Sequence, residues 1–152
     1  MAVENFRLVS PVEKVERRDL PLNAPALATP SNANPLVQGE FMELDSTNPR
    51  TVIRSGGDIL SWAVWSEKGR SDVQAIRKVP LLYMGTYEAD TIVMTAAGLT
   101  HGGALMVDDI TFESLTRSGL VIHGGGTELV VGYVTRLPAS NGNKLRFVQT
   151  MV

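Results

Sequence analysis

Cysteine is absent from the 152 residues, and histidine occurs only twice. The lack of cysteine excludes disulfide bonds and thiolate metal sites. A metal centre built on His101 and His123 would need a third ligand, and the two histidines do not stand at a metal-binding spacing. We therefore expect no metal site.

A concentrated positive charge is also missing. The formal net charge is −2 and the isoelectric point is about 5.7, whereas phosphate binding needs a basic face. The basic pair Arg17-Arg18 is flanked by Glu13, Glu16 and Asp19, so we interpret it as a self-neutralised surface stretch. We expect no direct nucleic-acid partner.

Long apolar runs are missing as well, and none approaches the roughly 18 residues that a membrane span requires. The first ten residues, MAVENFRLVS, include an acid and no apolar core typical of a secretory signal. We expect neither membrane insertion nor export by a signal peptide.

The stretch LVIHGGGTELVVGYV, residues 120–134, contains a His-Gly-Gly-Gly sequence that in some esterases supplies an oxyanion hole. That function also needs a G-x-S-x-G nucleophile motif. The nearest stretches, Gly69-Arg70-Ser71 and Arg117-Ser118-Gly119, lack the second glycine, and no P-loop or G-x-G-x-x-G is present. We predict no enzyme, no catalytic residue and no cofactor, and interpret residues 120–134 as two strands joined in a hairpin.

Two groups of residues leave alternatives open. The pairs Glu43/Asp45 and Glu88/Asp90 place carboxylates on one side of a strand, as in a glycosidase dyad or cation site, but solvent-facing strand positions have the same pattern. Five aromatic residues suit either a stacking platform for sugars or bases, or core and interface packing. They are Trp62, Trp65, Tyr83, Tyr87 and Tyr133.

Prolines recur about every five residues before residue 36, and no charge occurs between Asp19 and Glu40. This spacing prevents a helix and favours an extended path. The leucines within it are unusual for a solvated linker, so we predict residues 1–35 to be an arm that lies on its own domain or on a neighbouring protein, with a disordered tail as the alternative. The expected contact residues are Leu20, Pro21, Leu22, Pro25, Leu27, Pro30, Pro35 and Leu36.

Residues 36–152 show short β-forming runs separated by turn signals, which predicts an all-β domain, a small β-barrel or a β-sandwich. The runs expected to form strands are 36–45, 50–55, 59–66, 81–90, 91–96, 105–116, the two arms of 120–134, and 144–152. Residues 72–80 fit either a short helix or an irregular strand. Asn141-Gly142 predicts a type I′ hairpin between Leu137 and Leu145.

The proline-rich arm is followed by PLVQGEFMELD, by WAVWSEKGRSDVQAIRKVPLLYMGTYEADT and by VGYVTRLPASNGNKLRF. This order resembles the capsid decoration, or cement, proteins of tailed bacteriophages. The phrases PLVQGE and YEADT carry most of the resemblance.

The resemblance implies a non-enzymatic β-barrel protein on the outer surface of the virion capsid, assembled in the host cytoplasm. Its partners would be the major capsid protein and further copies of itself, as a homotrimer, and the arm would clamp neighbouring capsid subunits. A tail or baseplate β-barrel of the same virion and a small carbohydrate-binding barrel are the alternatives.

Overall fold

A computed structural model describes residues 5–10, 15–21, 36–46, 50–65 and 78–150. These residues form strands and one short 3-10 helix, η2 (Pro138–Ser140), with no α-helix among them, which confirms the predicted all-β class. The strands are β1 (Phe6–Ser10), β2 (Glu16–Pro21), β3 (Phe41–Leu44), β4 (Val52–Arg54), β5 (Ser61–Ala63), β6 (Lys78–Met84), β7 (Tyr87–Thr91), β8 (Ala104–Phe112), β9 (Leu115–Ile122), β10 (Gly132–Arg136) and β11 (Leu145–Gln149).

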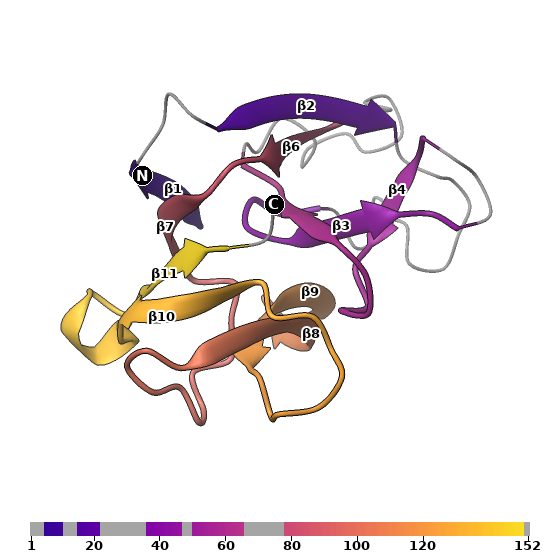
Figure 1. The fold of residues 1–152 in the computed structure, drawn as a ribbon. Helices are drawn as coiled ribbons and strands as arrows, with labels where there is room; N and C mark the ends of the chain where they lie inside the picture. The colour runs from indigo at the N-terminus through magenta and orange to yellow at the C-terminus, as the bar shows by residue number, and fades with distance from the viewer. Residues whose placement is uncertain (1–4, 11–14, 22–35, 47–49, 66–77, 151–152) are drawn as a thin grey trace.

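The strands form three sheets that wrap around a common interior (Figure 1). The largest has the order β1-β7-β11-β10-β8-β9 and curls like half a barrel. The second has the order β4-β3-β5, and the third consists of β2 and β6. All strand pairs within the sheets are antiparallel, which suits the short connections along the chain.

A bent two-stranded ribbon joins the sheets. β6 and β7 follow one another with a bend at Gly85, whose φ of 111° is readily adopted only by glycine. β2 pairs with β6 and β1 pairs with β7, so the two N-terminal strands form one side of the ribbon and β6 and β7 form the other. A single bridge between Val64 and Leu81 then connects the ribbon to the three-stranded sheet. Residues 72–80 were expected to form a short helix or an irregular strand. Residues 78–80 begin strand β6, and residues 72–77 lie outside the described residues.

The predicted hairpin at residues 120–134 is wrong. Leu120–Ile122 lies in β9 and Gly132–Val134 in β10, but β8 lies between these strands and pairs with both. β8 and β9 form the actual hairpin through Glu113 and Ser114, whose φ angles are 52° and 64°. A turn with positive φ at two non-glycine residues has no strong sequence signature, which is why the local pattern misled.

The hairpin around Asn141-Gly142 is confirmed, because β10 pairs with β11. Its turn differs from the predicted type I′ geometry. Positive φ angles occur at Gly142 (62°) and Asn143 (63°), whereas Asn141 has a φ of −139°. The helix η2 precedes the turn and lengthens the connection.

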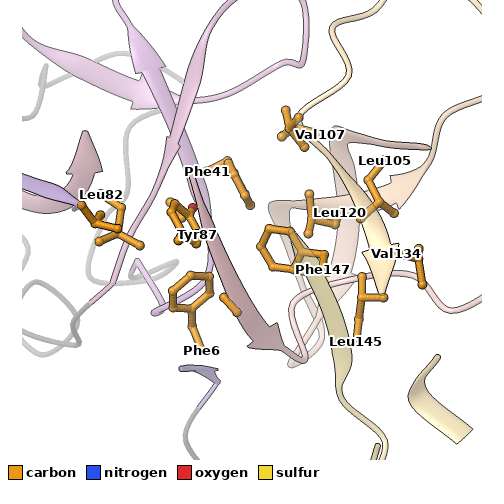
Figure 2. Packing of buried hydrophobic residues seen from close by; sticks show 14 residues of the cluster. Phe6, Phe41, Leu82, Tyr87, Leu105, Val107, Leu120, Val134, Leu145 and Phe147 are labelled. Carbon is orange, nitrogen blue, oxygen red and sulfur yellow. The ribbon is translucent and has the colours of Figure 1, made fainter. Parts of the chain in front are cut away.

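Two main clusters of buried side chains fill the interior. The larger lies inside the six-stranded sheet, where Phe6, Tyr87 and Phe147 meet edge to face with ring centroids 6.3–6.4 Å apart (Figure 2). The smaller lies between the three-stranded sheet and β6, and includes Met42, Trp62 and Leu81. After Lys78, β6 has only apolar and aromatic residues, and its two faces contribute to different clusters.

The described part of the predicted arm belongs to this architecture. Phe6 is a core residue in β1, Leu20 packs from β2 against the smaller cluster, and Leu36 is 1% exposed within that cluster. Leu36 is therefore a core residue here and has no surface to offer a partner. The division of the chain at residue 36 stays a prediction, since residues 22–35, with Leu22, Pro25, Leu27, Pro30 and Pro35, lie outside the described residues.

Candidate functional site

Exposed aliphatic side chains occur on two loops that are joined by a backbone hydrogen bond. Ile59 and Leu60, in the loop between β4 and β5, are 44% and 37% exposed, and Leu129, in the loop between β9 and β10, is 39% exposed. The backbone N–H of Leu129 donates to the carbonyl oxygen of Gly57 at 3.4 Å, which joins the loops. We call Ile59, Leu60 and Leu129 the loop patch; Figure 1 shows the β9–β10 loop passing close to the loop after β4.

The loop patch is anchored from below by a close backbone contact. Gly57 has a φ of 91°, and a Cβ at this position would lie 2.1 Å from the carbonyl oxygen of Val107 in β8. Glycine is thus required both for the backbone conformation and for the space. This close approach packs the β4–β5 loop, which carries Ile59 and Leu60, directly against the backbone of β8.

The sequence did not reveal the loop patch. Ile59 and Leu60 were expected to start a strand, but β5 begins only at Ser61, and both side chains are therefore left on the surface. Leu129 was assigned to a hairpin strand, and it lies in a loop instead. An unbroken apolar run gives no signal of where its strand begins.

A buried carboxylate, Glu40, was also missed. Its side chain is fully buried and accepts four hydrogen bonds, which compensate the burial of the charge. Two come from Arg54, through Nε at 2.7 Å and Nη2 at 3.3 Å, and two from the backbone N–H groups of Val37 at 2.8 Å and Ser118 at 3.3 Å. Glu40 therefore ties β4 and β9 to the turn that precedes β3.

The carboxylate pairs are not simple solvent-facing positions. Asp45 is buried, and Glu43 is half-buried and accepts hydrogen bonds from the Ser55 hydroxyl and the Gly56 N–H, both at 3.1 Å. Within the described ranges there is no group of three or more His, Asp or Glu placed to hold a metal ion. The Glu43 carboxylate thus serves the turn after β4.

Asp90 in the second pair is buried and bound to Arg146. The guanidinium donates through Nε to Oδ1 at 2.8 Å and through Nη2 to Oδ2 at 3.0 Å, and Asn141 Nδ2 donates to Oδ1 at 2.9 Å. Burial acts to raise the pKa of Asp90, but the hydrogen bonds from Arg146 and Asn141 and the charges of Arg146 and Arg7 outweigh it and hold this pKa below its usual value. The arrangement fastens the β10–β11 turn and β11 to β7.

The five aromatic residues do not form one platform. Trp62 is buried and stacks on Tyr83 with ring centroids 4.9 Å apart, and the Arg18 guanidinium covers Tyr83 at 4.5 Å. Arg17 covers Trp65 at 4.7 Å, and Tyr87 lies in the larger core. Adjacent residues of a strand point to opposite faces, so Arg17 and Arg18 cover aromatic rings on opposite sides of the β2–β6 pair.

Tyr87 and Tyr133 differ from each other in environment. Burial raises the pKa of the Tyr87 hydroxyl, and this oxygen has no hydrogen-bond partner among the residues that the structure describes. Tyr133 is exposed on β10, with Val148 and Ala104 opposite it on the neighbouring strands. The packing and interface interpretation thus fits the aromatic residues better than a shared stacking platform.

Comparisons with protein-family models, curated proteins and solved structures find no match. No helix with the length and hydropathy needed to cross a membrane occurs in the described ranges.

Proposed function

We propose that this protein is a non-enzymatic structural protein of a tailed bacteriophage, which binds the outside of the capsid and clamps neighbouring copies of the major capsid protein. It would be assembled in the host cytoplasm and bind as a homotrimer. The observation that best supports a protein-binding role is the loop patch, because exposed aliphatic side chains on fixed loops lose little conformational entropy on association.

The resemblance to decoration proteins supports the proposal through the fold. YEADT corresponds to the whole of β7, the strand between β1 and β11. LVQGE, residues 36–40, forms the buried turn that carries Glu40 and packs Leu36 and Val37 into two different clusters. Both phrases thus build the interior of the domain, and capsid binding is inferred from the family that they resemble.

The proposal is tested by co-sedimentation of the protein with preformed capsids of the virus that encodes it. Removing residues 1–35 is unsuitable because it deletes β1, β2 and the core residue Phe6. Two double variants separate the candidate surfaces instead: Leu22→Ser with Leu27→Ser in the arm, and Ile59→Ser with Leu129→Ser in the loop patch. Leu44→Ser is the matched control, since Leu44 is 40% exposed but lies outside the loop patch.

Saturable binding by the wild type, weakened by either double variant and kept by Leu44→Ser, is expected. Ile59 and Leu129 are 44% and 39% exposed, and each such side chain buried on binding stabilises the complex by about 1 kcal/mol, so the loop-patch variant should weaken binding by on the order of tenfold to thirtyfold. Absence of wild-type binding to capsids would refute the proposal, and binding to isolated tails would place the protein there.

A further inference from the structure

The histidine of the HGGG sequence closes the β9–β10 loop on itself. The Nδ1 atom of His123 lies 3.0 Å from the backbone nitrogen of Gly125, and Nε2 lies 2.8 Å from the carbonyl oxygen of Glu128. The imidazole therefore spans the loop from Gly125 to Glu128.

The two partners fix the protonation of the ring. A backbone N–H can only donate, so Nδ1 must be an unprotonated acceptor; a carbonyl oxygen can only accept, so Nε2 must carry the proton. Only the neutral imidazole with its proton on Nε2 satisfies both contacts. The imidazolium ion has N–H donors on both nitrogens, and its Nδ1–H would face the N–H of Gly125.

We propose that His123 is a pH-responsive clasp: the neutral ring holds the β9–β10 loop closed, and protonation of Nδ1 in mild acid releases it. Histidine is the side chain that ordinarily changes charge between pH 5 and pH 8. The released segment includes Leu129, so the clasp controls the conformation of the loop patch. This inference rests on the loop geometry and is independent of the partner proposed above.

The glycines make the clasp possible. Gly125 has a φ of 85°, a left-handed conformation that other residues rarely adopt, and it turns the chain between the two contacts that the ring makes. A Cβ at Gly126 would lie 2.4 Å from Oε2 of Glu128, so the Glu128 side chain folds over this glycine. The cluster His123-Gly124-Gly125-Gly126 is thus a loop closure built around one imidazole.

Charged and titratable groups occur on each described element around the ring. Glu128 lies in the same loop, and its carboxylate lies over Gly126. Asp58 lies in the β4–β5 loop, which binds the backbone of Leu129, and His101 lies in the turn before β8, where the carbonyl oxygen of Ala104 accepts a hydrogen bond from the His123 backbone at 2.9 Å. The backbone N–H of Gly125 has no protonation state to change, so it faces the Nδ1–H of a charged ring at any charge of these side chains.

Variants at the two histidines isolate the effect. In His123→Asn, the side-chain oxygen can accept the Gly125 N–H as in an Asx turn, but it does not titrate between pH 8 and pH 5. His101→Asn is the matched control, since His101 is exposed and also precedes a glycine turn. Both substitutions leave the glycines and the core unchanged.

The test is NMR on the full chain between pH 7.5 and pH 5.5. Long-range ring correlations at pH 7.5 should show the proton of His123 on Nε2. Protection of the Gly125 amide from hydrogen exchange, corrected for intrinsic rates, should fall in acid by up to about tenfold, as expected for one lost hydrogen bond. Core amides such as that of Phe147 should stay protected, which distinguishes loop opening from unfolding.

The fall in protection should persist in His101→Asn and disappear in His123→Asn. A ring protonated on Nδ1 at pH 7.5 would overturn the proposal. An acid response of the same size in wild type and His123→Asn would overturn it as well, because the loop would then open for a reason other than His123.

Discussion

Replacing Phe6 by alanine tests whether the N-terminal segment is part of the domain core. Phe6 is 1% exposed and packs edge to face on Tyr87 at 6.3 Å and on Phe147 at 6.4 Å. Removing a buried phenylalanine side chain costs about 3–5 kcal/mol, a large part of the roughly 5–15 kcal/mol that holds a domain folded. At this chain length the melting temperature should fall by about 6–20 °C.

Urea unfolding followed by the fluorescence of Trp62 and Trp65 measures the change in free energy of unfolding. Leu44→Ala is the control, because Leu44 is 40% exposed and its truncation should change stability by less than about 1 kcal/mol. If Phe6→Ala were as mild as Leu44→Ala, Phe6 would not be in the core. The pairing of β1 with β7 would then be refuted.

Two further predictions concern electrostatics and backbone space. The pKa of Asp90 is lower in the folded chain than in the unfolded one, so its ion pair stabilises the protein above the ordinary carboxyl range near pH 4, and this contribution is lost as the pH falls through the lowered value. Asp90→Asn should therefore lower the free energy of unfolding by about 1.5–3 kcal/mol at pH 7. In urea titrations, the difference in this free energy between wild type and variant should shrink toward pH 2. A difference that stays constant with pH would contradict the lowered pKa of Asp90. Gly57→Ala should cost about 2–5 kcal/mol, because a Cβ would meet the Val107 carbonyl oxygen at 2.1 Å in addition to the strain of a φ of 91°. Gly142→Ala is the control, because Gly142 has a φ of 62° but no atom lies within 4 Å of the added Cβ. It should cost only about 1 kcal/mol. Equal losses for the two variants in thermal melts would show that Gly57 does not approach the Val107 carbonyl oxygen closely.

The sequence predicted the fold class and the position of most strands, because β-forming runs and turn residues are local signals. Residues 36–45 and 50–55 each contain one observed strand, whereas 81–90 and 105–116 were each expected as one strand and contain parts of two strands with a turn between them. Of residues 91–96, only Thr91 continues a strand, and Met94 makes a single bridge to Leu120. Strand existence was therefore more predictable than strand length.

Strand order was less predictable, because the neighbours of a strand depend on contacts far along the chain. The hairpin rule favours consecutive runs as partners, yet β9 and β10 are separated by β8. β1 escaped notice because five residues such as FRLVS give too short a pattern, and its role comes from pairing with β7. Pairings of this kind leave no mark in local periodicity.

The buried charges and the loop patch were hidden for a similar reason. Charged residues are ordinarily placed on the surface, and Glu40 is buried only because donors from Val37, Arg54 and Ser118 converge on it, the last from 78 residues away. The glycine run after His123 was noticed in the sequence. The contacts of the His123 ring with Gly125 and Glu128 depend on the backbone angles of the loop and could not be predicted. Sequence patterns thus identified the residues, and the fold determined what they do.

The position of β7 governs when this protein can fold during synthesis. β7 lies between β1, which is synthesised before it, and β11, which is synthesised after it; Thr91 pairs with Phe6 on one side and with Leu145 on the other. Until the final strand emerges, β7 has an unpaired edge, and such edges attract other chains. The six-stranded sheet is therefore completed only after β11 has emerged, and translational pauses between β7 and β11 should increase aggregation more than pauses before β7.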